Sequence, residues 1–342
     1  MKKQNLNALY PHPYPYVVDV VPPVIHNPIS VLYFLCRWIF AGNTSPEYTA
    51  EYVDGVVRAV GDAREGLWKM GFFGKGILSR SEPSWDIRTK RRLGLHVEEG
   101  VYAPEEVTQF RREQRQHFKA ERAKAEEEEL KRRQDIDRGL AVADKNEDDK
   151  PVRPEFDRDA FLAKSYEMEK RTEDDEVVDS LGNLVDIEFL QLMDVEALFL
   201  HMAFGLKVGD MDVKAMVDEF TRKDPRFLTY YAVYHHYRSL GWCVRSGIKF
   251  GADFLLYKKG PPFTHAEFCI KVMPKDEPMP DFWWQSNLCR VIGGVKKTTV
   301  FCFVDVPKVE GVVDDAKLVE VLKQFKVREV VYRRWIPSRN RD

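Results

Sequence analysis

The chain has 342 residues, of which 44% are hydrophobic and 32% charged, and its 53 basic and 55 acidic side chains leave a net charge of −2. This length is enough for two domains, or for one domain with a large insertion. The near-neutral balance excludes binding to nucleic acid through overall charge, so any such binding depends on a local basic patch. The five widely spaced cysteines are typical of reduced core residues in an intracellular protein.

Several motifs that define common site classes are absent from the sequence. It contains no CxxC pair, no Cys/His cluster with zinc-ligand spacing, no HExxH string and no P-loop. We therefore expect no metal site and no cofactor. The first residues lack the apolar core of a signal peptide, and no apolar run approaches the length of a bilayer span. A soluble protein with no membrane span is the expectation.

Residues 1–103 are predicted to form a mostly helical N-terminal region. Within it, the segment from about Pro46 to Gly61 is interpreted as an amphipathic helix. The following string "GFFGKGILSRSEPSW" has glycines at 71, 74 and 76, which indicate tight backbone in a loop docked on the core. Lys75 and Arg80 on this loop are either solvated or in contact with phosphate.

A charged segment interrupts this region at residues 104–158. Its string "RREQRQHFKAERAKAEEEELKRRQDIDR" combines strong helix formers with charges of both signs, which predicts a solvent-exposed helix. The acidic, proline-containing stretch after it is predicted to be a linker. Residues 159–222 then continue the helical N-terminal domain.

Residues 223–342 are predicted to form a compact α/β domain. The strings "WCVRSGIKFG", "ADFLLY", "HAEFCIKV", "TTVFCFVDV" and "VREVVYRRW" are short and rich in β-branched and aromatic residues, so they are expected to be strands of a mixed sheet. Helices are predicted at Phe227 to Leu240 and at Phe282 to Lys297. The predicted fold class of the whole chain is therefore α+β.

Two polar rings flank the loop between two of these strands. In "HAEFCIKV" alternate residues from Ala266 to Val272 are apolar, which places them on the core face and His265 on the opposite face. The loop "KKGPPFT" is short enough for an antiparallel hairpin with Tyr257 and His265 at its mouth. Because aromatic rings at strand ends usually serve packing, this pair alone does not assign a function.

Longer strings around the hairpin resemble the tRNA-splicing endonuclease family. The similarity runs from roughly Phe227 to Val306 and includes "DFLLYKKGPPFTHAEFCIKV" and "RVIGGVKKTTVFCFV". The strings "HNPIS", "GFFGKGILSRSEPSW" and "RWIPSRNRD" extend it over most of the chain, and they are similar to the eukaryotic subunit that cuts the 5′ splice site. For residues 223–342 the resemblance implies a restriction-endonuclease-like nuclease domain.

The resemblance also implies a catalytic triad of Tyr257, His265 and Lys297. The "RVxxxVxK" pattern selects Lys297 over Lys296, although a one-residue shift leaves Lys296 as the alternative. RNA carries its own nucleophile, the 2′-hydroxyl, so cleavage needs a base, an acid and a cation but no metal. By resemblance these are the tyrosine, the histidine and the lysine, in that order. A phenol is mostly protonated at neutral pH, and Lys297 and the hairpin lysines are the candidate cations that favour its ionised form.

Two further residues are implied to bind RNA. Arg290 and Trp335 resemble the family's cation–π pincer around a bulged adenine. Arg290 lies seven residues before Lys297 and is therefore expected on the same side of a helix, whereas Trp335 lies in the basic tail. The implied partners are intron-containing pre-tRNA and the sister subunits of a heterotetramer, one catalytic and two structural. "VREVVYRRW" is an edge-strand candidate for pairing with a sister subunit. The nucleus is the expected location, with the cytosolic face of mitochondria as the alternative.

Two competing functions remain open at this point. The first is a metal-dependent restriction-type nuclease that uses Asp253, Glu267 and Lys271, although Glu267 and Lys271 are four residues apart instead of two. The second is a non-catalytic subunit that keeps the fold and only supports the complex. The presence of all three triad residues argues against it.

Overall fold

The computed structural model describes residues 48–97, 101–138, 158–167, 177–178, 184–307 and 315–333. These residues form two compact units. One unit contains the described residues up to Ile77 together with those from Phe189 onward, and the other contains Leu78–Glu188. The predicted RNA-binding Trp335 lies outside the described residues.

The Leu78–Glu188 unit is mainly helical in its described parts. It contains α4 (Trp85–Arg92), α5 (Pro104–Asp137) and α6 (Arg158–Glu167). The long helix predicted from the charged segment is confirmed as α5, and side-chain pairs one turn apart, such as Arg122 with Glu126, lie along it. The N-terminal end of α5 is stabilised by Glu106, whose carboxylate accepts hydrogen bonds from Arg91 and from the Tyr166 hydroxyl.

The first part of the larger unit is built on a sheet that the sequence did not predict. Its strands lie in the order β3-β4-β2-β1-β5. Three helices, α3 (Gly61–Gly71), α7 (Asp194–Phe204) and α8 (Val213–Lys223), belong to the same part. The strands are β1 (Thr49–Val53), β2 (Val56–Ala59), β3 (Lys75–Gly76), β4 (Leu190–Leu192) and β5 (Lys207–Val208).

The helix predicted from Pro46 to Gly61 is therefore wrong over its described residues. That stretch forms the β1–β2 hairpin, in which Val53 pairs with Val56. Asp54 and Gly55 form the turn with φ values of 52° and 76°. An Asp-Gly pair between β-branched residues is a strong hairpin signal because both turn residues need positive φ. This local signal outweighs the helical spacing of the apolar residues.

The second part of the larger unit contains the predicted mixed sheet, in the order β10-β9-β8-β7-β6. All five predicted strands are confirmed. The β8–β9 pair is parallel and the other pairs are antiparallel. The strands are β6 (Cys243–Ser246), β7 (Phe254–Tyr257), β8 (Phe268–Pro274), β9 (Thr298–Asp305) and β10 (Lys326–Tyr332).

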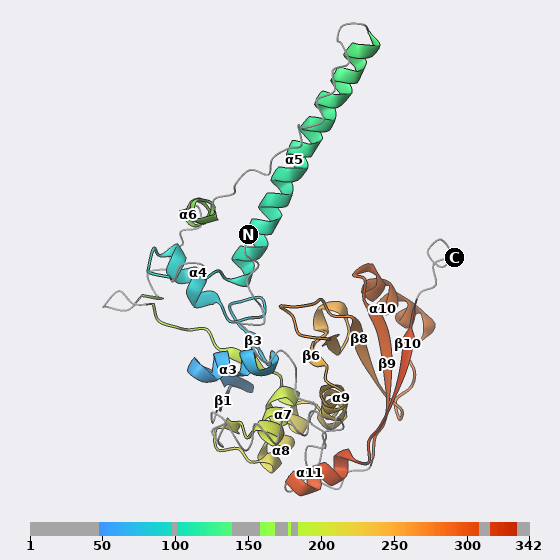
Figure 1. The fold of residues 1–342 in the computed structure, drawn as a ribbon. Helices are drawn as coiled ribbons and strands as arrows, with labels where there is room; N and C mark the ends of the chain where they lie inside the picture. Colours follow the sequence, from blue (N-terminus) through green and yellow to red (C-terminus); the bar gives the residue numbers. More distant parts are fainter. Residues whose placement is uncertain are drawn as a thin grey trace, which may run out of the picture. The chain divides into compact units, whose positions relative to one another are not determined.

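Helices cover both faces of this C-terminal sheet (Figure 1). Helix α9 (Phe227–Ser239) packs with Ile270 and Val272 in the main core, whereas α10 (Phe282–Gly294) packs with Cys269 and Met273 in a second cluster. The expectation that only one face of β8 is apolar is therefore wrong, because Cys269 on the other face is fully buried. The main core also includes residues of the first sheet, so the two sheets share one apolar interior.

The predicted α+β class is confirmed by these two sheets and their helices. A last helix, α11 (Asp315–Leu322), precedes β10. The four cysteines of the described residues, Cys243, Cys269, Cys289 and Cys302, are buried and free. Among the helices in the described part of the chain, none is both long and apolar enough to cross a bilayer.

Candidate active site

Three strand ends meet at one end of the C-terminal sheet. Tyr257 is the last residue of β7, and the backbone N–H of Glu267 donates to the Leu256 carbonyl at 3.0 Å. On the other side of Glu267, its carbonyl accepts from Thr298 N at 3.0 Å, where β9 begins. The antiparallel and parallel registers thus place Tyr257, Glu267 and Lys297 side by side across three neighbouring chain segments.

His265 lies in the loop that enters this end of the sheet. The strand predicted to start at His265 starts at Phe268, so the histidine is not a strand residue. Its side chain is exposed, as the sequence pattern predicted. It lies two positions before Glu267, the neighbour of Tyr257 on the adjacent segment, so the connection from 258 to 267 places it at the mouth of the hairpin.

Lys297 points into the same region. Its Nζ donates to the Ala266 carbonyl at 3.3 Å and lies 5.3 Å from the centre of the Phe250 ring. The neighbouring Lys296 is exposed and has a φ of 57°. Because α10 ends at Gly294, helical spacing does not extend to Lys297, and the argument that placed Arg290 on the same helical side as Lys297 is wrong. Arg290 itself is an exposed residue of α10.

The environment of Tyr257 differs from the one the sequence suggested. Burial raises the pKa of its phenol above the ordinary value, and the positive charge of Arg245 acts in the opposite direction. The thiols of Cys243 and Cys269 also raise this pKa. Sequence reasoning proposed Lys297 and the hairpin lysines as the cations near the phenol and missed Arg245, whose only sequence signal is a charge within the buried string "CVRS".

The carboxylates of the metal-dependent alternative do not gather at this end of the sheet. Asp253 binds Lys271 Nζ at 2.9 Å and accepts from Val272 N at 2.7 Å. Lys271 lies four residues beyond Glu267 along the strand direction, which corresponds to about 13 Å. Asp253 therefore forms a structural ion pair far from Glu267, and the two acidic groups do not form a shared site.

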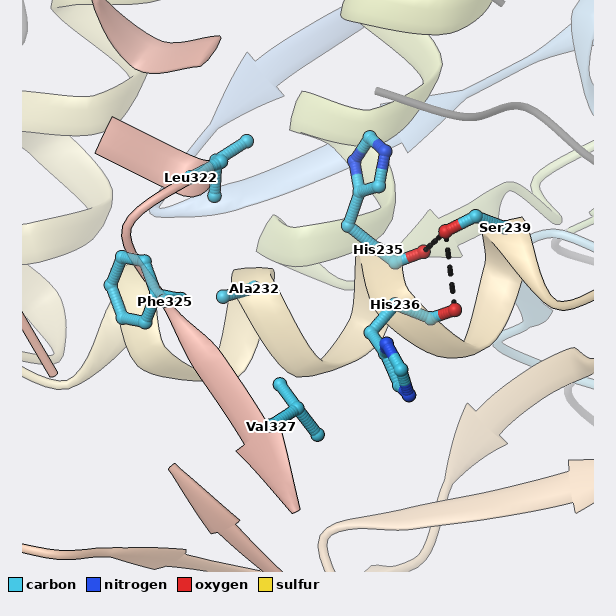
Figure 2. Close-up of a pocket in the computed structure, with 7 residues that line it drawn as sticks. All are labelled: Ala232, His235, His236, Ser239, Leu322, Phe325 and Val327. Carbon is cyan, nitrogen blue, oxygen red and sulfur yellow. Dashed lines mark hydrogen bonds between the residues drawn. The ribbon is translucent and has the colours of Figure 1, made fainter. Parts of the chain in front are cut away.

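Figure 2 shows a pocket elsewhere in the larger unit. Four of its lining residues come from α9, including His235 and His236, whose rings point in different directions, and Phe325 and Val327 lie on the opposite wall. The hydroxyl of Ser239 donates to the carbonyls of His235 and His236 at 2.6 and 3.1 Å. None of the predicted site residues lines this pocket.

Comparison with known proteins identifies the family. Residues 227–311, which include the Tyr257–Lys297 region, match the tRNA intron endonuclease, catalytic C-terminal domain. The tRNA-splicing endonuclease subunit SEN2 of Saccharomyces cerevisiae is 38% identical over 368 aligned positions, covering 97% of this chain and 97% of the yeast protein. The chain belongs to the tRNA-splicing endonuclease subunit family.

Two other members of the tRNA-splicing endonuclease family show how far the similarity extends. The subunit SEN2 of Eremothecium gossypii is 41% identical over 352 positions, with 97% of both chains covered. The mouse subunit Sen2 is 36% identical over 167 positions, which are 45% of this chain and 36% of the mouse protein. The family recognition from sequence strings is thus confirmed, and the chain is an enzyme of the tRNA-intron endonuclease type.

Proposed function

We propose that this chain is the subunit that cuts intron-containing pre-tRNA at the 5′ splice site, with Tyr257, His265 and Lys297 as its catalytic residues. The observation that carries the proposal is the convergence of the end of β7, the entry to β8 and the start of β9 at one end of the sheet. The assignment to the 5′ site rests on the strings outside the catalytic domain that resemble the subunit with that specificity.

The reaction needs only groups found at this end of the sheet and in the substrate. The Tyr257 phenolate removes the proton of the 2′-hydroxyl, whose oxygen then forms a bond to the neighbouring phosphorus. The bond from phosphorus to the 5′-oxygen breaks, and the protonated imidazole of His265 gives its proton to that oxygen. The Lys297 ammonium stabilises the extra negative charge on the phosphate. The products are a 2′,3′-cyclic phosphate and a 5′-hydroxyl, and no metal-bound nucleophile is required.

RNA binding is proposed to use Arg290 and Trp335. Arg290 is exposed on α10, and its guanidinium is free to stack on an unpaired base in the way that arginine planes do in RNA recognition. Trp335 follows β10 by three residues in the sequence. An indole and a guanidinium on either side of one adenine would hold the intron junction without reading a long sequence.

The decisive experiment is His265→Ala in the endonuclease assembled with all its subunits. We expect one of the two intron cuts to be lost, the 5′ cut, while pre-tRNA binding is retained. His117→Ala, at an exposed histidine of α5, is the matched control and should leave both cuts unchanged. Cleavage of the precursor is mapped at both junctions with and without EDTA.

Each competing function predicts a different result. Unchanged cutting at both junctions in His265→Ala would support a scaffold subunit. Loss of cutting by the unmodified enzyme in EDTA would support the metal-dependent mechanism. Loss of the 3′ cut alone would keep the triad but overturn the assignment of the splice site.

The partners are proposed to be sister subunits in a heterotetramer with one further catalytic and two structural chains. β10 is an edge strand, and Val330, Val331 and Tyr332 on it are 42%, 56% and 37% exposed. An apolar edge strand favours pairing with another chain. Val331→Lys should reduce co-purification of the sister subunits, whereas Ile248→Lys, at a residue that is 81% exposed but outside the edge strand, should not. Equal co-purification of both variants would exclude this edge.

A further inference from the structure

The tight backbone predicted around Gly71 and Gly74 forms a buried turn at the end of α3. We call residues 71–74 the Gly71–Gly74 turn. Phe72 ends the helix in the left-handed conformation with a φ of 58°, and both Phe72 and Phe73 are buried. The proposed function gives this turn no part, although it lies in the same compact unit as the catalytic hairpin.

Two buried arginines bind the carbonyl groups of the turn. Arg238 on α9 is fully buried, and its Nη1 donates to the Gly71 carbonyl at 3.1 Å. Arg245 on β6 is 9% exposed, and its Nη1 donates to the carbonyls of Phe72, at 2.5 Å, and of Gly74. A buried guanidinium needs such acceptors to offset its loss of hydration, so these contacts fix both arginines and the turn.

The other side of the turn contacts the loop that connects Tyr257 to His265. The Phe72 and Phe263 rings pack edge to face with their centres 6.2 Å apart. Gly260 in the same loop approaches the Phe72 ring so closely that a Cβ at that position would lie 2.3 Å from it. The turn therefore packs directly against the loop through Phe72, and a shift of Phe72 would displace the segment that carries His265.

The charges around the turn have a net positive sign. Glu196 is its buried carboxylate, which accepts from Gly74 N at 3.2 Å and from Met193 N at 3.0 Å. Burial raises the pKa of this carboxyl group. Even with Glu196 fully ionised, its single negative charge is smaller than the two positive charges of the guanidinium groups that bind the turn. The excess positive charge favours a negative group nearby.

Tyr257 is the ionisable residue of the proposed mechanism that lies within electrostatic reach of this charge. Cys243, which pairs with Tyr257 across β6 and β7, is two residues from Arg245, so the arginine stands diagonally across from the tyrosine. Arg245 lowers the pKa of Tyr257 against the effects of burial and of the Cys243 and Cys269 thiols. Of the other charged groups at this strand end, Lys258, Lys259, His265 and Glu267 are exposed and therefore screened by solvent. Lys297 is half-buried, but its ammonium is bound to the Ala266 carbonyl and is not among the charges that act on Tyr257.

We propose that Arg245 is a positioning residue for cleavage, which fastens the Gly71–Gly74 turn under the Tyr257–His265 loop and holds a fixed positive charge diagonal to the Tyr257 phenol. This inference rests on the proposed role of Tyr257 as the base. Arg238 is also buried and binds the same turn, but it is not among the charges that act on Tyr257. It is therefore the matched control that separates support of the turn from action on the phenol.

The test places a fluorinated tyrosine, which has a more acidic phenol, at position 257 of the assembled endonuclease. Fluorine NMR then follows ionisation of this one residue, independently of cleavage. Arg245→Gln should raise its apparent pKa by about one unit, which is a tenfold loss of phenolate below that pKa. Arg245→Lys, which keeps the charge, and Arg238→Gln should each leave it within about a third of a unit.

Cleavage of pre-tRNA by the same variants with natural tyrosine completes the test. Arg245→Gln should cut the 5′ site about tenfold more slowly at neutral pH with precursor binding retained, and Arg245→Lys should recover most of that rate. An unchanged fluorotyrosine titration in Arg245→Gln, or an equal shift in Arg238→Gln, would overturn the proposal. If Tyr257→Phe cuts normally, the proposed function fails instead, whatever the titration shows. If Arg245→Gln does not fold, a shifted titration in Arg245→Lys counts against the proposal.

Discussion

Lys297 and Ala266 meet where the chain enters β8: the Lys297 Nζ donates to the Ala266 carbonyl at 3.3 Å, one residue after His265 in the chain. This contact links the start of β9 to the loop that carries the proposed acid. It holds the ammonium group against the backbone one residue after the histidine. The cation is thereby positioned by backbone that also positions the acid.

The first prediction uses the two adjacent lysines as a matched pair. Lys297→Met should reduce cutting by about a hundredfold or more, because the ammonium that stabilises the phosphate charge is lost. Lys296→Met should cut at close to the normal rate, since its side chain is exposed beyond the left-handed backbone at φ 57°. Single-turnover cleavage of pre-tRNA measures both. The reverse order of effects would show that the family pattern is shifted by one residue.

A second prediction concerns the Asp253–Lys271 ion pair. Asp253→Asn leaves Lys271 without its 2.9 Å partner, so the free energy of unfolding should fall by about 1–3 kcal/mol. Cutting by the folded variant should persist, in EDTA as well, because the pair stabilises β7 against β8 and takes no part in the reaction. Thermal unfolding and cleavage are measured on the same preparation. A variant with normal stability and no cutting would restore Asp253 as a candidate metal ligand.

The third prediction follows from the direction of the Tyr257 pKa. Burial raises this pKa, so below it the phenolate fraction grows about tenfold for each pH unit. With natural pre-tRNA the reaction also needs a proton donor for the leaving 5′-oxygen, so its cutting rate should rise less steeply with pH than the phenolate fraction does. A precursor with sulfur in place of the leaving 5′-oxygen needs no acid, so His265→Ala should cut it at the unmodified enzyme's rate. Both rates should then rise about tenfold per pH unit.

Two outcomes would contradict this third prediction. If His265→Ala fails to cut the sulfur-containing precursor, the histidine is not simply the acid. If the rate with that precursor stays flat from neutral to mildly alkaline pH, an ionising group of raised pKa is not the base.

A fourth prediction tests the contact between Gly260 and Phe72. Gly260→Ala combines a φ of 112° with a Cβ placed 2.3 Å from the ring, so it should lower stability by about 2–4 kcal/mol and slow cutting. Gly205→Ala, where φ is 69° and the space around the Cβ is open, should lower stability by only about 1 kcal/mol and leave cutting unchanged. Urea unfolding and single-turnover cleavage are the measurements. Equal cutting by both variants would show that the loop does not depend on Phe72.

Local pattern by itself determined much of the catalytic domain. Short runs of β-branched and aromatic residues predicted β6 to β10, and the helix predicted from Phe282 to Lys297 forms, although it ends at Gly294. Where two local signals competed, as in the Asp54–Gly55 hairpin, the choice of the helical period was wrong. The candidate triad came from family strings, because spacing alone did not distinguish Tyr257 and His265 from packing residues.

Only the tertiary structure decided what surrounds those residues. Arg245 binds the Phe72 carbonyl across 173 positions of sequence, and Glu196 binds Gly74 across 122. Neither contact can be recognised from a periodic pattern in the sequence, since each depends on how α3, α7 and β6 pack in three dimensions. The sequence therefore determined which groups are proposed to carry out the reaction. The packing determined which buried charge lies near the phenol that is proposed as the base.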